Sequence, residues 1–232
     1  MAAVKRVPAK KVPAKGAGER SVRGYDASGR REQARLTRLA VLDTARRLFL
    51  ETGYAGTTLS AVAKSAGVSV ETIYKAFGNK PGLVKAIFDV AVVGDDAPVP
   101  MLQREFVRQN MAEPDPRKKL AGYGVHVGEV GPRTGPILLV VRDAAAADPA
   151  AAEVWAKMQQ ERLTGMTVFA QHLATSGHLR DDVSVEQARD VLWTHNSVEL
   201  WDLLVNQRGW SNKRFGQWVG EQLIAALLPP RE

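Results

Sequence analysis

Between residues 57 and 83, the sequence TTLSAVAKSAGVSVETIYKAFGNKPGL places hydrogen-bonding side chains on a short helix that follows a tight turn. Helical spacing over residues 70–77 turns Ile73, Ala76 and Phe77 inward. The same spacing turns five residues outward: Val70, Glu71, Thr72, Tyr74 and Lys75. Hydroxyl, carboxylate and amine groups on such a helix can hydrogen-bond to base edges and phosphates when the helix lies in the major groove of DNA.

Two helices joined by a turn are needed to position that outward face. Thr57 or Thr58 can cap the first helix, and Gly67 can end it because a left-handed turn favours a residue without a β-carbon. Ser69 can cap the second helix. A purely structural helical hairpin can show the same glycine turn. The combined spacing of four residues favours a DNA-binding helix-turn-helix instead: Ala63, Gly67, Val68 and Ile73.

The remaining segments are also predicted to be helical. A first helix over residues 30–52 has apolar residues at three- and four-residue spacing: Leu36, Leu39, Leu42, Ala45, Leu48 and Phe49. Further helices are predicted over residues 82–93, 101–111, 116–130, 136–147, 149–175, 185–207 and 212–228, and Ser184 with Gln187 predicts a capping box. Because no segment alternates as a strand does, the expected fold is all-α, with domains at residues 30–80 and 81–232.

Positive charge is concentrated in the first third of the chain. The net charge is +7, with +7 carried by residues 1–31, +4 by residues 32–85 and −4 by residues 86–232. A polyanion would therefore be attracted to the N-terminal part. Residues 1–29 are rich in Lys, Pro, Ala and Gly and are predicted to be a disordered basic tail. The tail is either a solubilising segment or an arm that contacts phosphates or enters the minor groove.

Several classes of function are disfavoured by composition. The chain has no cysteine, which excludes disulfides and thiolate metal sites. Its four histidines (126, 172, 178 and 195) show no metal-ligand spacing. No catalytic arrangement, metal or cofactor is predicted, so an enzyme is not expected. With no membrane-spanning apolar run and no secretory signal, we expect a cytoplasmic protein without membrane contact.

The block over residues 45–91 resembles the DNA-binding domain of a TetR-type transcriptional regulator. The matching features are the LF…GY…TT opening, the AxxxGVS turn, the TIYxxF helix and the K-x-x-L start of the next helix. Beyond this block, the chain resembles the family only in being helical and of suitable length. The resemblance implies a three-helix N-terminal helix-turn-helix domain, followed by a C-terminal helical bundle for ligand binding and dimerisation.

The resemblance also implies which residues meet DNA. Phosphate contacts are expected from Thr57, Thr58 and Lys80, and base contacts from Ser69, Val70, Glu71 and Thr72. Tyr74 and Lys75 are expected against the DNA backbone. The chain departs from the family pattern at Glu71, where small residues are common, and at Lys75, where an aromatic residue or His is frequent. Glu71 either accepts a hydrogen bond from cytosine or holds a neighbouring Arg or Lys in place.

A homodimer on an inverted-repeat operator and a small-molecule effector are likewise implied by the resemblance. Residues 149–175 and 185–207 have apolar surfaces wide enough to pack internally and against a partner. Candidate effector-binding residues lie in the second domain: Met101, Tyr123, His126, Arg142, Trp155, Met158, Trp193 and Trp201. Aromatic and Met side chains suit an apolar or planar ligand, with Arg142 as a polar contact, although for each residue taken singly core packing is the commoner role.

The predicted function is a sequence-specific DNA-binding transcriptional regulator, a repressor that an effector releases from its operator. The alternative is a non-specific architectural DNA-binding protein led by the basic tail. Such a protein would bind any duplex with a steep salt dependence.

Overall fold

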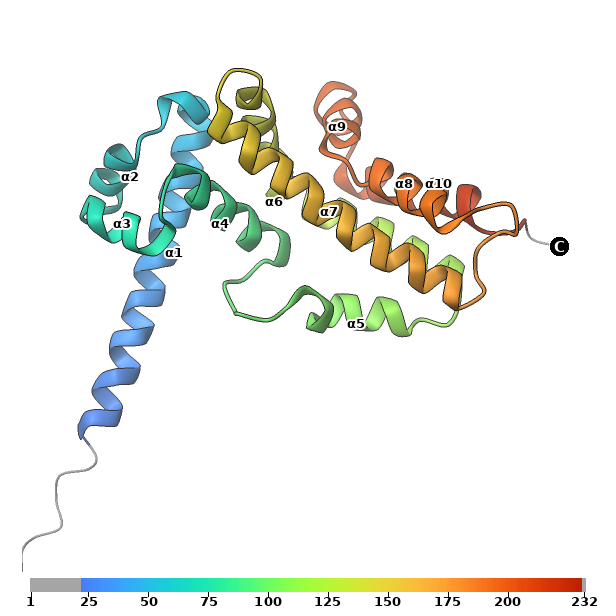
Figure 1. The fold of residues 1–232 in the computed structure, drawn as a ribbon, viewed down its shortest axis with the longest axis horizontal. Coiled ribbons are helices and arrows are strands. Elements are labelled where there is room, and N and C mark those ends of the chain that lie inside the picture. The colour runs from blue at the N-terminus through green and yellow to red at the C-terminus, as the bar shows by residue number, and fades with distance from the viewer. Residues whose placement is uncertain (1–21, 231–232) are drawn as a thin grey trace, which may run out of the picture. The chain divides into compact units, whose positions relative to one another are not determined.

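The computed structural model describes residues 22–230 of the 232-residue chain. The chain divides into two compact units, residues 1–38 and residues 39–232. In the described part every regular element is helical (Figure 1), which confirms the predicted all-α fold. The second unit contains both the helix-turn-helix and the C-terminal bundle.

The first helix, α1 (Val22–Gly56), begins earlier than predicted. Residues 22–29 had been assigned to the disordered tail, but they are helical because adding a residue to an existing helix costs far less than nucleating a new one. Residues 1–21 of the predicted tail lie outside the described residues. The apolar face also begins later than predicted, since Leu36 is 48% exposed whereas Leu42 and Phe49 are buried. Gly53 interrupts the regular helix with a φ of 72°.

The helix-turn-helix consists of α2 (Leu59–Ala66) and α3 (Val70–Phe77). Thr58 caps α2, and its hydroxyl accepts a hydrogen bond from the Ala61 amide at 3.1 Å. Gly67 ends α2 in the left-handed conformation, with a φ of 66°. The predicted cap and turn residues are therefore confirmed at these positions.

The fourth helix, α4 (Lys80–Val93), begins directly after α3. Asn79 caps it, because the Gly82 amide donates to Asn79 Oδ1 at 2.8 Å. A β-carbon at position 82 would lie 2.1 Å from the Phe77 carbonyl oxygen. Only glycine permits this close approach of α3 and α4.

The predicted helix over residues 101–111 is divided in the structure. A 3-10 turn, η1 (Met101–Gln103), precedes α5 (Glu105–Ala112), and Arg104 between them is extended. The Arg104 guanidinium binds the Asp95 carboxylate at 2.7 and 2.8 Å and donates to the Ala97 carbonyl at 2.7 Å. These contacts hold Arg104 against the preceding loop, which a local helical pattern cannot reveal.

The two helices predicted over residues 116–130 and 136–147 are one helix, α6 (Pro116–Ala145), which continues through Pro132 and Pro136. A proline inside a helix costs about 3 kcal/mol, so tertiary packing must offset this cost. A β-carbon at Gly131 or Gly135 would lie 2.6–2.7 Å from the Trp201 ring, and one at Gly128 would lie 2.5 Å from a backbone oxygen. Close packing on both sides of the prolines keeps the helix continuous.

The next long helix, α7 (Pro149–Thr175), lies beside α6 (Figure 1). It is followed by α8 (Val185–His195), for which Ser184 and Gln187 form the predicted capping box. The chain ends in α10 (Asn212–Leu227), which packs along α6. These three helices form most of the bundle with α6.

The predicted single helix over residues 185–207 breaks after α8. A short helix, α9 (Val198–Trp201), follows with Ser197 as its cap, and it continues into a π-helical turn, η2 (Asp202–Gln207). Arg162 of α7 donates hydrogen bonds to the Trp193 carbonyl and to Asn196 Oδ1. The bond to Trp193 satisfies a backbone carbonyl that has no partner within α8. The position at which α8 ends therefore depends on a residue distant in the sequence.

Two buried clusters form the core of the second unit. One joins α1, α2, α3 and α4 to α6 and α7, and includes Phe49, Ile73, Leu83, Ile137 and Met158. The other lies among α6, α7, α8, α9 and α10, and includes Leu120, Phe169, Leu173, Leu192 and Leu223. Leu138 and Trp155 pack against both clusters. The helix-turn-helix and the bundle therefore share apolar packing.

Candidate functional site

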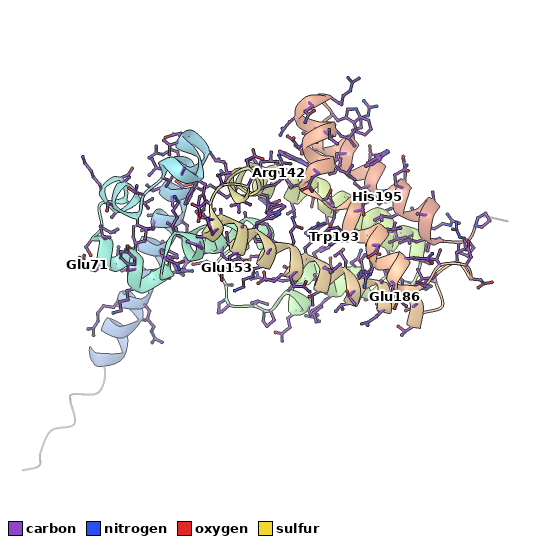
Figure 2. All side chains as sticks on the ribbon, turned by 45° about the horizontal axis from the view of Figure 1, so that its top comes forward. Glu71, Arg142, Glu153, Glu186, Trp193 and His195 are labelled. Atoms are coloured by element: carbon purple, nitrogen blue, oxygen red, sulfur yellow. The ribbon has the colours of Figure 1, made fainter. Side chains whose placement is uncertain are left out.

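The outward face of α3 carries four of the residues predicted to contact DNA: Glu71 and Thr72 at base edges, and Tyr74 and Lys75 at the DNA backbone. All four are exposed, and Tyr74 is 54% exposed although it is aromatic. Ile73 on the opposite side is fully buried and anchors the helix. Figure 2 shows Glu71 at the outer edge of α3. Val70, also predicted to read bases, is only half-exposed and packs against the core.

Ser69 organises the start of this face. Its hydroxyl accepts a hydrogen bond from the Thr72 amide at 3.2 Å and lies 3.1 Å from the Thr72 hydroxyl. Hydrogen bonds from the backbone amide of Glu71 and from Ser69 hold the pKa of the Glu71 carboxyl below its usual range. Glu71 is therefore ionised at neutral pH, and only a hydrogen-bond donor or a cation suits it as a contact.

The two threonines before α2 have different environments. Thr58 is exposed and its hydroxyl caps α2. Thr57 is 2% exposed, and its hydroxyl donates to the Gly53 carbonyl at 2.8 Å and lies 3.0 Å from the Thr52 hydroxyl. The expectation that Thr57 presents an exposed hydroxyl to phosphate is therefore wrong. Its side chain instead joins the end of α1 to the start of α2.

Lys80 lies at the first position of α4, over an aromatic ring. Its Nζ is 4.2 Å from the centroid of the Tyr54 ring. Burial lowers the Lys80 pKa, and the charge of Asp148 acts in the opposite direction. Burial, together with Asp148, also raises the pKa of Tyr54 to about 12, and the Tyr54 hydroxyl is buried without a partner. Lys80 is also the first residue of α4, and a helix N-terminus favours an anion.

The eight predicted effector-binding residues do not converge on one place. Met101 is exposed in η1, and Arg142 at the end of α6 pairs with the adjacent Asp143 carboxylate at 2.9 Å. His126 stacks on Phe106 with ring centroids 3.6 Å apart. Trp201 packs on the α6 glycines, and Trp155 and Met158 belong to the core. For these six residues packing or surface pairing is what the structure shows.

The other two, Tyr123 and Trp193, belong to one polar cluster, in which Tyr123 is buried and the other members are half-buried. It includes three residues that the sequence did not predict as site residues. This acceptor-poor cluster comprises Tyr123 of α6, Arg162 and Met166 of α7, and Trp193 and Asn196 at the end of α8. Figure 2 shows Trp193 on α8, and Arg162 lies over its ring with the guanidinium carbon 4.4 Å from the centroid. Asn196-Ser197 within an apolar pattern was the available sequence signal, since both residues favour helix ends.

Burial dominates the electrostatics of this cluster. It lowers the pKa of Arg162 to about 10, against opposing contributions from Tyr123 and Glu199. Burial also raises the pKa of Tyr123 to about 12, although the hydrogen bond from Asn196 and the charge of Arg162 act the other way. At neutral pH the cluster holds one cation and a neutral phenol.

The described residues contain no group of three or more His, Asp and Glu side chains that could hold a metal ion. Within the same part of the chain, every helix is too short or too polar to cross a membrane.

Residues 41–87 match a family model described as bacterial regulatory proteins, tetR family. The match identifies residues 41–87 as a DNA-binding domain of the type found in that family. The HTH-type transcriptional regulator TtgR of Pseudomonas putida is 42% identical over 59 residues. These residues are 25% of this chain and 28% of TtgR, so the chain matches little more than a quarter of the length of this curated relative.

Solved structures resemble a larger part of this chain. NalD, the secondary repressor of the MexAB-OprM multidrug efflux pump in Pseudomonas aeruginosa, has a TM-score of 0.65 at 19% identity. The similarity covers 84% of this chain and 98% of NalD. FadR of Bacillus subtilis, solved with stearoyl-CoA, has a TM-score of 0.64 at 18% identity, covering 81% of this chain and 98% of FadR. At these identities the similarity establishes the common fold.

Proposed function

We propose that this TetR-family protein is a sequence-specific transcriptional regulator, a repressor that a small-molecule effector releases from an inverted-repeat operator. The observation that carries the proposal is the outward face of α3. Glu71, Thr72, Tyr74 and Lys75 are exposed on a capped helix whose inner side is anchored by a fully buried Ile73. Within the family's DNA-binding domain, such a face suits the major groove.

Phosphate contacts would position that helix on the duplex. Thr58 is exposed at the start of α2, and Lys80 begins α4, so both lie at helix N-termini. Amides at a helix N-terminus and a nearby ammonium favour a phosphate together. We assign Thr58, Lys75, Lys80 and Tyr74 to the DNA backbone, and Ser69, Glu71 and Thr72 to base edges, with Val70 packing beside them.

We propose a homodimer because α3, the helix that would contact base edges, is short. The eight residues of α3 can contact too few base pairs for selective binding, so two copies on an inverted repeat are needed. The surface at the start of α10 supports this arrangement, because Trp210, just before this helix, and Trp218 within it are only half-buried, with ring centroids 6.1 Å apart. Half-buried aromatic residues are enriched at interfaces between protein chains.

The fourth helix is placed to connect effector binding with DNA binding. Its buried residues Leu83, Val84 and Ile87 belong to the cluster shared by the helix-turn-helix and the bundle. Lys85 of α4 also forms an ion pair with Glu161 of α7, with Nζ 2.9 Å from Oε2. An effector that prefers a shifted α7 would therefore move α4 and the helix-turn-helix, and DNA would disfavour that effector to the same extent.

The proposal is tested by selecting fragments of genomic DNA from the source organism with the purified full chain at physiological salt. Enrichment of one inverted-repeat sequence is the expected result. Retention of fragments without a common motif would favour the architectural alternative. A variant with Tyr74→Ala and Lys75→Ala should lose the enrichment while keeping its unfolding midpoint, because both side chains are exposed.

We also propose that the protein is not an enzyme. Its matched domain and the regulators it resembles support binding as the activity. Effector chemistry is then limited to reversible contacts, so the effector should be recovered unchanged after incubation.

A further inference from the structure

The acceptor-poor cluster contains more hydrogen-bond donors than it can satisfy. Tyr123 is 8% exposed, and its hydroxyl donates to Met166 Sδ at 3.2 Å. Asn196 donates to the Tyr123 oxygen at 2.7 Å and to the same sulfur at 3.4 Å. A thioether is a weak acceptor, so two good donors are directed at a poor partner.

Arg162 adds a positive charge to the same place. Its guanidinium donates to Gln159 Oε1, to the Trp193 carbonyl and to Asn196 Oδ1, which are all neutral acceptors. Among the described residues, no carboxylate forms an ion pair with Arg162, whereas other half-buried arginines, such as Arg104 and Arg142, do have one. Glu199 acts on Arg162 only through longer-range charge attraction. A half-buried cation that is held by neutral acceptors is costly, because cations withdrawn from water are usually paired.

Trp193 supplies a further donor. Its Nε1 is buried and has no hydrogen-bond partner, although Arg162 lies directly over the ring. Most buried polar atoms in proteins are hydrogen-bonded, so an orphaned indole N–H indicates an acceptor that the protein itself does not provide.

Helix capping explains only part of this arrangement. A cation at the end of α8 is favourable because the helix dipole places negative partial charge there, and Arg162 bonds the Trp193 carbonyl. Capping does not require Tyr123 to donate to sulfur, nor does it leave Trp193 Nε1 without a partner. Those two donors are unrelated to the helix end, so a second role is needed to account for them.

We propose that this cluster binds the carboxylate of an aromatic or aliphatic acid, which would be the effector class of this regulator. A carboxylate oxygen would replace Met166 Sδ as the acceptor for Tyr123 and Asn196, and its charge would neutralise Arg162. The unbranched Met166 side chain can rotate aside at little cost. Phe169, which is buried edge-on to Tyr123 with ring centroids 5.1 Å apart, makes the surroundings of the carboxylate apolar.

The inference rests on the proposed function. In the structure, α7 connects the cluster to α4. Arg162 follows Glu161, whose carboxylate binds Lys85 of α4. A ligand that shifts Arg162 therefore acts on the segment of α7 that holds α4. The predicted polar contact, Arg142, lacks this connection and already has its own carboxylate.

The test compares acids with their uncharged amides by isothermal titration calorimetry on the full chain. The probes are 2-naphthoate with 2-naphthamide and octanoate with octanamide. In at least one pair the acid should bind about tenfold or more tightly than the amide, since a hydrogen bond to a charged group contributes that much. Tyr123→Phe should weaken acid binding by about tenfold and amide binding by less, because a hydrogen bond to a neutral acceptor contributes less than one to a charged group. Arg162→Gln should remove the preference for the acid.

Arg142→Gln is the matched control, and it should keep the full preference. Unfolding midpoints identify any variant that fails to fold, and Tyr123→Phe keeps the inference testable if Arg162→Gln unfolds. Equal affinity for acid and amide in both pairs, no binding of either, or a preference that survives Arg162→Gln would overturn the inference. Operator selection without any probe tests the proposed function separately. A protein that selects an operator but shows no acid preference refutes only the carboxylate site.

Discussion

Lys80 combines two roles that are usually separate. Its ammonium lies over the Tyr54 ring, and the side chain is partly withdrawn from water. Its position at the start of α4 also places the charge where a phosphate is favoured. A substitution must therefore remove the charge without uncovering the ring, and Lys80→Met does so because its side chain is similar in length.

We expect Lys80→Met to weaken binding to operator and unrelated duplexes alike. One lost phosphate contact should lower the slope of log affinity against log salt by about one unit. Fluorescence anisotropy at four salt concentrations measures both effects. Lys157→Met, at an exposed position on α7, should leave affinity and slope unchanged. A change in base preference would instead assign Lys80 to a base edge.

His126 is buried in a way that disfavours its charged form. It stacks on Phe106, and burial, assisted by the charge of Arg133, lowers its pKa to about 4. The unfolded chain should titrate near the ordinary value for His, about 6.5. The unfolded state therefore takes up a proton first as pH falls, and the folded state is destabilised between these two values.

We expect His126→Phe to make stability less sensitive to acid. Relative to pH 7.5, the wild-type protein should lose about 2 kcal/mol more unfolding free energy at pH 5 than the variant does, which follows from the two pKa values. Urea unfolding at both pH values gives the difference. Parallel losses in the two proteins would mean that His126 is protonated in the folded state and that its ring is not withdrawn from water.

At single positions, the sequence predicted caps well and burial poorly. Thr58, Gly67, Ser69 and the Ser184 capping box depend on neighbours within four residues, and all are confirmed. Thr57 differs because its burial depends on the bend at Gly53, which brings the Gly53 carbonyl to its hydroxyl. Patterns of exposed and apolar residues carry no information about such a bend.

At the level of elements, the junction of α3 and α4 depends on Gly82. We expect Gly82→Ala to destabilise the protein by about 1–3 kcal/mol, because its β-carbon would meet the Phe77 carbonyl oxygen and push the two helices apart. Thermal unfolding and operator affinity should both fall. Gly165→Ala on α7 is the control, since its β-carbon would meet nothing within 4 Å. That variant should be neutral or more stable by up to about 1 kcal/mol.

Helix boundaries were predictable only where they are set locally. Residues 59–66 and 70–77 begin and end at local caps, and the helix-turn-helix was predicted accordingly. The continuity of α6 through Pro132 and Pro136 depends on Trp201 and α10, which lie far along the chain. The break after α8 depends on Arg162. Distant contacts outweighed local signals in both cases.

On the scale of the whole molecule, the N-terminal part is positively charged and the remainder of the chain is negatively charged. Residues 1–85 carry +11 and residues 86–232 carry −4. Long-range attraction would therefore draw a polyanion such as DNA to the N-terminal part and not to the bundle. The sequence predicted this polarity and the all-α fold, because both depend on composition and periodicity. The sequence could not predict that Tyr123 of α6, Arg162 of α7 and Asn196 at the end of α8 lie together.

The N-terminal segment provides the last test at this scale. Residues 2–21 hold six Lys and Arg residues against one acidic residue, Glu19, and their deletion leaves α1 complete. We expect the deletion to weaken operator binding mainly at low salt, because each lost phosphate contact lowers the salt slope by about 0.9. Base preference should not change, since charge attraction alone reads no sequence. Anisotropy titrations of both proteins at low and physiological salt measure this effect. Identical affinities would show that the segment serves only solubility. A changed base preference would show that the segment enters the minor groove.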